Sequence, residues 1–323
     1  MADMTPRAGA AEFLTAAGWG AARVEPLAGD ASFRRYFRVV EGTRTAVLMD
    51  APPPHEDPRP FLSVAGWLAE RGFRAPAVIA ADVEAGLILL EDLGDDRMRE
   101  TADAHPDREV HLYESAVDTL VELHRHPAGP LQPYDAAVLH READLMTEWY
   151  CPAVGLEVDA PAYATAWAKV FRHALPPAEP VTVLRDYHAE NLMLTGDRLA
   201  LLDFQDALAG HPAYDLVSLL QDARRDVDPN LEERMLARYQ AATGAGDAFL
   251  NAYHVLGAQR NAKIIGIFTR LWKRDGKPRY PALCPRVWAY LERDLSAPVL
   301  RPVAEWFDHQ VPPEKRGDPM LLA

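Results

Sequence analysis

Three polar residues between Val181 and Asp206 have the types and spacing that metal-assisted phosphoryl transfer requires. Asp186 follows one apolar run and precedes Asn191 by five residues, and Asp203 follows a second apolar run. An amide oxygen and a carboxylate make a hard-oxygen site suited to Mg²⁺, which takes its other ligands from water and phosphate. Asp186 could reach the same point as the base for an attacking hydroxyl. Taken alone, Asp-x₄-Asn is a common pattern, and Asp186 could equally be an ordinary turn residue.

Two short apolar runs are expected to position the metal ligands. The runs 192–194 and 199–202 flank Thr-Gly-Asp-Arg, which is typical of a β-hairpin with glycine at its tip. If the turn centres on Asp197, Asn191 and Asp203 lie directly opposite each other, with Cβ atoms about 5 Å apart. A shift of one residue would place them on opposite faces of the hairpin, so the predicted metal site depends on this register.

The motif Asp-x-His-x-x-Asn, from Asp186 to Asn191, is followed by a strand pair that ends in Asp203. This pattern resembles the aminoglycoside phosphotransferase and choline kinase family, whose members are relatives of protein kinases. The resemblance implies that Asp186 is the base, that Asn191 and Asp203 hold Mg²⁺, and that ATP is the phosphoryl donor. Two positions differ from the family pattern: Leu184 stands where His is usual, and Glu190 stands where Gly is frequent. Neither change alters a group that contacts metal or phosphate in this arrangement.

The order of expected elements fits an α+β, protein-kinase-like fold with two lobes. Residues 1–92 predict a small, β-rich N-lobe that binds the nucleotide; we expect helices at 8–17 and 60–71 and strands at 24–27, 35–40, 45–49, 77–83 and 87–90. Residues 93–323 predict a larger, mainly helical C-lobe that carries the catalytic residues and binds the sugar, with helices at 112–124, 215–221 and 249–272.

The nucleotide site is expected in the N-lobe. The backbone groups of Glu91 and Leu93 could bind adenine, and the backbone of a small-residue turn could line the phosphates; that turn comprises Gly29, Asp30, Ala31, Ser32 and Phe33. Kinases normally place a lysine on the third strand to contact the phosphates, but Met49 stands there in this chain. One of Arg34, Arg35 and Arg38 could replace that lysine on the inward face. Alternatively, these arginines are ordinary solvated strand residues.

A closer resemblance extends over nearly the whole chain. Five runs look like a bacterial subfamily of anomeric kinases that act on N-acetylmuramate and N-acetylglucosamine, and these runs are residues 29–38, 47–53, 89–95, 219–227 and 270–280. That subfamily also carries Met at the N-lobe lysine position. The resemblance implies transfer of the γ-phosphoryl group of ATP to the C1 hydroxyl of a free amino sugar. The product would enter nucleotide-sugar synthesis in cell-wall recycling.

The expected acceptor has a chemical requirement that the residues can meet in part. N-acetylmuramate carries a lactyl carboxylate, so its site should offer cations, whereas an aminoglycoside site should offer carboxylates. Arg224, Arg225 and Arg260 are candidates for a bidentate contact, and Gln221 is a weaker candidate for the sugar hydroxyls. Alternatively, the basic residues form a solvated helix face. Asp215 is expected to support the catalytic loop as a hydrogen-bond acceptor.

Composition narrows the possible partners. The formal net charge of −14 over 323 residues argues against a broad basic face for nucleic acid or an anionic membrane. No apolar run reaches membrane-spanning length, and the first residues do not resemble a signal peptide. Cys151 and Cys284 suggest neither a disulfide framework nor a zinc site. We expect a cytoplasmic protein with a small-molecule partner and no evident obligate protein partner.

Two alternatives remain open at this level. The same chemistry could act on an aminoglycoside, choline or another small alcohol, and the charge of the acceptor pocket would separate these cases. The chain could instead be a nucleotide-binding pseudokinase scaffold, which Met49 and Leu184 would fit. Retention of Asp186, Asn191 and Asp203 argues against a scaffold, because a scaffold needs no base.

Overall fold

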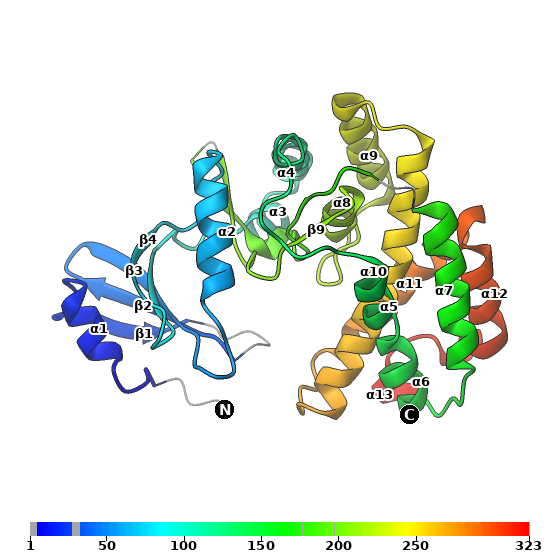
Figure 1. The fold of residues 1–323 in the computed structure, drawn as a ribbon, viewed down its shortest axis with the longest axis horizontal. Helices are drawn as coiled ribbons and strands as arrows, with labels where there is room; N and C mark the ends of the chain where they lie inside the picture. The colour runs from blue at the N-terminus through cyan, green and yellow to red at the C-terminus, as the bar shows by residue number, and fades with distance from the viewer. Residues whose placement is uncertain (1–4, 28–32, 176–177, 197, 323) are drawn as a thin grey trace. The chain divides into compact units, whose positions relative to one another are not determined.

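The chain divides into two compact units in the computed structural model, which describes residues 5–27, 33–175, 178–196 and 198–322. The first unit comprises residues 1–104 and 190–207 and is rich in strands, and the second comprises residues 105–189 and 208–323 and is mainly helical (Figure 1). The predicted α+β class is therefore confirmed. The compact units do not follow the predicted boundary after residue 92, because residues 93–104 and 190–207 pack with the sheet.

The first unit is built on a five-stranded antiparallel sheet with the order β1-β2-β3-β5-β4. Its strands are β1 (Arg23–Pro26), β2 (Arg35–Glu41), β3 (Arg44–Asp50), β4 (Val78–Asp82) and β5 (Leu87–Glu91). Each lies within one or two residues of its predicted range. Gly42, with φ of 62°, permits the tight turn between β2 and β3.

The two faces of this sheet have different partners. Phe37 and Leu48 are cross-strand neighbours on one face, where they pack against helix α1 (Ala10–Ala16) in a buried apolar cluster. Because side chains alternate along a strand, Arg38 and Met49 belong to the opposite face. The sheet thus has one apolar face, which packs against α1, and a second face, which carries Arg38 and Met49.

Helix α2 (Arg59–Glu70) follows the third strand, and its buried residues recur at helical spacing on one side. One of them, Phe61, stacks on Phe204 with ring centroids 5.0 Å apart. Phe204 follows the hairpin of β7 (Leu192–Thr195) and β8 (Arg198–Leu201). In β8, the Leu201 N–H donates to the Arg74 carbonyl at 2.8 Å. Helix α3 (Met98–Ala104) also contacts β7. These contacts explain why the hairpin belongs to the first unit.

The second unit is organised around α10 (Asp247–Lys273), which packs against α5 (Ala136–Ala143), α7 (Ala160–Ala174), α8 (Ala213–Leu220) and α11 (Cys284–Leu295). Its other α-helices are α4 (Glu109–Leu123), α6 (Cys151–Ala153), α9 (Pro229–Thr243), α12 (Arg301–Gln310) and α13 (Pro319–Leu322). Strand β6 (Val181–Val183) pairs with β9 (Leu208–Gly210) and leads into the loop of Asp186. None of the helices in the described ranges combines the length and apolar character needed to cross a membrane.

Candidate active site

The predicted hairpin forms, but its register differs by one residue from the prediction. Leu192 pairs with Leu201, and the Leu202 N–H donates to the Asn191 carbonyl at 2.9 Å. Leu202, and not Asp203, therefore lies opposite Asn191. The reason is the turn: Thr195 pairs with Arg198, next to Gly196 with its φ of 62°, so each β7 residue pairs with a partner one position earlier than predicted.

Asp203 lies beyond the end of β8, where strand alternation no longer decides the direction of its side chain. Its φ is 57°, a left-handed conformation that non-glycine residues seldom adopt and that is concentrated at functional sites. The side chain is 27% exposed, accepts a hydrogen bond from Gln205 Nε2 at 2.8 Å, and has Arg34 Nη2 at 3.6 Å from Oδ1. The register argument that placed Asn191 opposite Asp203 is therefore wrong, and the assignment of the two residues to a metal stays a prediction that rests on the family resemblance.

The oxygen chemistry of this segment fits a magnesium ion held by few protein groups. Asp203 presents a partly exposed carboxylate and Asn191 a half-buried amide, both hard-oxygen donors. No group of three or more His, Cys, Asp or Glu side chains with metal-binding geometry occurs among the described residues. A transition-metal cage is therefore not suggested there, whereas Mg²⁺ commonly relies on one or two protein groups and on substrate phosphates.

The remaining residues predicted to bind nucleotide are only partly described. Gly29, Asp30, Ala31 and Ser32 lie outside the described residues, so their assignment stays a prediction. Phe33 is 65% exposed and stacks on His55 with centroids 5.1 Å apart. Arg34 follows it and is oriented toward Asp203.

The predicted adenine-binding segment begins at the end of β5. The Glu91 N–H donates to the Ala77 carbonyl at 2.8 Å, so the Glu91 carbonyl is the backbone group that could serve adenine. Its carboxylate binds Arg74, and this hydrogen bond holds the pKa of Glu91 below its usual range. Leu93 lies half-buried in the irregular segment that follows. The assignments of Glu91 and Leu93 stay predictions.

The loop that carries Asp186 belongs to the second unit and is fixed by Asp215 of α8. The Leu184 N–H donates to Asp215 Oδ2 at 2.6 Å, and the Arg185 N–H donates to Oδ1 at 2.8 Å. Arg185 has a φ of 71°, so the chain turns sharply between β6 and Asp186. The supporting role expected for Asp215 is confirmed. Burial raises the pKa of Asp215 to about 7, although the two backbone donors act in the opposite direction.

Positive charges surround the half-buried Asp186. Burial would raise the pKa of its carboxyl, but the charges of His188, Lys263, Arg260 and Arg185 outweigh this effect and lower the pKa. Burial also lowers the pKa of His188 to about 4, so its imidazole is neutral near pH 7. At neutral pH, the positive charges that act on Asp186 therefore include those of Lys263 and Arg260 on α10 but not that of His188. The carboxylate is ionised there and can accept a hydrogen bond from a hydroxyl.

These cations have defined neighbours. Arg260 is 4% exposed, and its Nη2 donates to Ser218 Oγ at 2.8 Å. Lys263 Nζ lies 2.9 Å from Glu142 Oε1, and Glu142 also forms an ion pair with Arg185. Glu142 and Ser218 were not identified from the sequence. They come from helices distant in the chain, and no local motif marks them.

The four residues predicted to bind the acceptor divide into two pairs. Arg224 lies beside the catalytic loop, with Nη1 3.3 Å from His188 Nε2, and Arg260 acts electrostatically on Asp186. Arg225 instead pairs with Glu109 at 2.6 Å. Gln221 is fully buried in a polar network of the helical core, where it contacts Asn261 at 2.7 Å and Asp294 at 3.2 Å. The assignment of all four residues to the acceptor stays a prediction, and the contacts of Arg224 and Arg260 near Asp186 favour these two.

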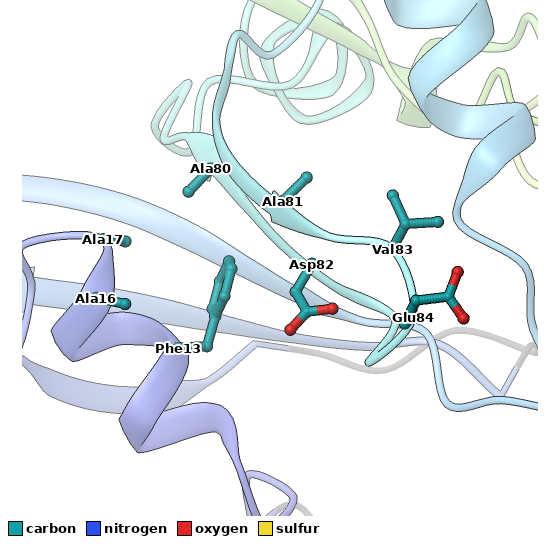
Figure 2. Close-up of a pocket in the computed structure, with 8 residues that line it drawn as sticks. All are labelled: Phe13, Ala16, Ala17, Ala80, Ala81, Asp82, Val83 and Glu84. Carbon is teal, nitrogen blue, oxygen red and sulfur yellow. The ribbon is translucent and has the colours of Figure 1, made fainter.

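A separate groove of about 450 Å³ lies between α1 and the turn after β4, on the α1 side of the sheet (Figure 2). Phe13 and the small residues of α1 form one wall, and the β4 turn contributes Asp82 and Glu84. Figure 2 shows Phe13 beside Asp82. None of the predicted site residues lines this groove, and its two carboxylates disfavour a phosphate-bearing ligand.

Comparisons with known proteins agree with the family resemblance and with the fold. Residues 23–253 match the phosphotransferase enzyme family. The chain is 40% identical to the N-acetylmuramate/N-acetylglucosamine kinase of Caulobacter vibrioides, over 95% of this chain and 97% of that protein. It is 42% identical to the protein of the same name from Pseudomonas aeruginosa, over 88% of each chain.

Solved structures share the fold at low sequence identity. A choline/ethanolamine kinase family protein from Mesorhizobium loti superposes with a TM-score of 0.63 at 17% identity, over 88% of this chain and 92% of the other. An ADP-bound aminoglycoside phosphotransferase superposes with a TM-score of 0.57 at 16% identity, over 88% and 94% of the two chains. The predicted kinase-like fold is confirmed by these similarities.

Proposed function

This chain belongs to the phosphotransferase enzyme family, and from that premise we propose that it is an ATP-dependent kinase of the C1 hydroxyl of N-acetylmuramate and N-acetylglucosamine. The observation that carries the proposal is the 40% identity, over almost the full length of both chains, to a kinase named for these two sugars. The product, a sugar 1-phosphate, would serve nucleotide-sugar synthesis in cell-wall recycling. ATP supply and such a pathway make the cytoplasm the proposed location.

The metal-binding half of the site would consist of Asn191 and Asp203. Their oxygens would hold Mg²⁺, which in phosphoryl transfer neutralises the charge on the phosphate oxygens. The left-handed backbone at Asp203 and its bond to Gln205 fix the carboxylate while leaving it partly exposed. Such a pre-positioned carboxylate needs little reorganisation when it binds a cation.

Asp186 would bind and orient the acceptor hydroxyl. Its lowered pKa keeps it ionised, so it accepts a hydrogen bond from the hydroxyl and takes the proton as the new O–P bond forms. A carboxylate with a low pKa is a weak base, and orientation of the nucleophile is therefore its larger contribution. The two bonds from Leu184 and Arg185 to Asp215 hold the loop in this geometry.

The charge near Asp186 supports an anionic acceptor over a cationic one. Arg224 and Arg260 adjoin the loop, whereas the charge of Lys263 is offset by its ion pair with Glu142. An arginine can bind a carboxylate in a bidentate manner, which suits the lactyl group of N-acetylmuramate. Aminoglycosides and choline carry positive charge and would be repelled by these residues.

Phosphorus NMR of the protein with MgATP and single acceptors tests this proposal. With N-acetylmuramate or N-acetylglucosamine as the acceptor, we expect one ADP to form for each anomeric sugar phosphate. With kanamycin or choline we expect no product. Asp186→Asn serves as the matched negative control. Product from choline or an aminoglycoside alone would replace the proposed acceptor, and nucleotide binding without any product would favour a scaffold.

A further inference from the structure

The third strand of the sheet has no cation at the position where kinases place their phosphate-binding lysine. Met49 occupies the position expected for lysine, is fully buried, and pairs across the sheet with Tyr36 of β2. A thioether is at most a weak hydrogen-bond acceptor and carries no charge. A cation that binds the phosphates in this unit must therefore come from another position; Arg44, at the start of the same strand, pairs with Glu41.

Two of the three candidate arginines are engaged away from Asp203. Arg35 pairs with Asp50 at 2.6 Å, and the strand register places both on the face covered by α1. Arg38 lies on the opposite face but binds Asp92 at 2.9 Å and Asp95 at 2.7 Å, in the segment after β5. Each guanidinium is held at short distance by carboxylates that are not predicted to bind metal.

Arg34 differs from both in its position. Its Nη2 lies 3.6 Å from Oδ1 of Asp203, a predicted metal ligand, and its side chain is 12% exposed. This separation exceeds hydrogen-bonding distance, so the pair attracts without a direct bond. Asp206 and Glu56 also act on its charge, which places Arg34 beside the acidic end of the hairpin segment.

A shared metal ion would link Arg34 to phosphate. A phosphate oxygen that bound the same Mg²⁺ as Asp203 would be brought close to the Asp203 carboxylate. A guanidinium 3.6 Å from that same carboxylate is then within reach of the phosphate. We propose that Arg34 binds the phosphates of ATP and thereby replaces the lysine absent at Met49; this rests on the proposed function only in taking ATP as the donor.

The test compares nucleotides with and without phosphates on the full-length protein. Binding of MgATP, MgADP and adenosine is measured by isothermal titration calorimetry for the wild type, Arg34→Gln, Arg34→Lys and Arg38→Gln. We expect Arg34→Gln to weaken MgATP and MgADP by about tenfold to hundredfold, the range for loss of charged hydrogen bonds, with adenosine affinity unchanged. Arg34→Lys should recover part of the loss because it keeps the charge.

Arg38→Gln is the matched control, because Arg38 lies within β2, close to Arg34 in the chain, and on the same face of the sheet as Met49. It should not weaken ATP relative to adenosine. The proposal is overturned if Arg34→Gln binds MgATP as the wild type does, or if Arg38→Gln shows the phosphate-specific loss instead. Thermal melting of each variant identifies misfolding, and a loss shared equally by adenosine and ATP also counts against Arg34. These affinities involve no sugar, so they stand apart from the outcome of the NMR assay.

Discussion

Asp203 is a predicted metal ligand whose place in the hairpin differs from the one that the sequence indicated. The sequence predicted that Asp203 faces Asn191 across a hairpin, but the register places Leu202 there. A left-handed backbone at Asp203 removes it from the strand alternation on which that argument relied. Nothing in the sequence predicts a positive φ at a non-glycine residue, because the surrounding structure imposes that conformation.

The separate roles of Asp186 and Asp203 lead to different losses on substitution. Asp186→Asn should lower kcat by about 10²- to 10⁴-fold, the usual range for a positioned base, while MgADP affinity stays near that of the wild type. Asp203→Ala should abolish turnover and also remove the Mg²⁺-dependent part of ADP binding. Steady-state kinetics and ADP titrations with and without Mg²⁺ measure both effects. Equal loss of nucleotide binding in the two variants would contradict these roles.

The cations around Asp186 predict a pH effect with a definite sign. Because Arg260 lowers the pKa of Asp186, Arg260→Gln should raise that pKa, and activity should then be lost at a higher pH on the acid side. The acid limb of the kcat–pH profile measures this shift. Arg238→Gln is the control, since Arg238 is a partly exposed residue paired with Asp118. A uniform fall in kcat at every pH would instead assign Arg260 a structural role.

At the scale of elements, periodicity predicted the sheet and the principal helices well. The ranges of β2, β3 and α10 agree with the predicted ranges to within two residues, and most residues of α10 are buried. The polar network around Gln221 was not predictable in the same way. Its partners Asn261 and Asp294 lie on α10 and α11, and only the packing of those helices brings them together.

Two glycines within helices should respond to alanine in opposite directions. In α10, a Cβ on Gly266 would overlap the backbone of Leu145, so Gly266→Ala should destabilise the protein by about 1–3 kcal/mol. Gly66 in α2 is exposed with open space around its Cβ position, so Gly66→Ala should stabilise by about 0.5–1 kcal/mol. Urea unfolding compares the two variants with the wild type. A stabilised Gly266→Ala variant would show that the backbone of Leu145 can move to accept the new Cβ atom at little cost.

At the scale of the whole molecule, the chain passes between its two compact units more than once. Residues 190–207 leave the helical unit and pack with the sheet, after which the chain returns at Leu208. The boundary predicted after residue 92 was drawn from the order of the expected elements along the chain. Local sequence patterns indicate this order but not which elements pack together. The return of a distant hairpin depends on tertiary contacts such as that of Phe61 with Phe204.

This arrangement predicts how local stability is shared along the chain. Phe204 is fully buried and stacks on Phe61, and Phe307 is fully buried among aromatic residues of the helical unit. Replacement of either by Ala should cost about 3–5 kcal/mol. Hydrogen exchange followed by mass spectrometry at low denaturant should show lost protection in the sheet and in residues 190–207 for Phe204→Ala. For Phe307→Ala, the loss should fall on the helical unit.

The physical basis is that each unit has its own buried core, so an opening event in one need not disrupt the other. Residues 190–207 test whether the two units open independently, because the chain joins them to the helical unit whereas they pack with the sheet. If packing dominates, their protection follows the sheet in both variants. Equal loss of protection across both units in Phe204→Ala would mean that the chain opens as one cooperative body. A substitution in the hairpin would then lower the stability of both the predicted nucleotide-binding residues and the loop of Asp186.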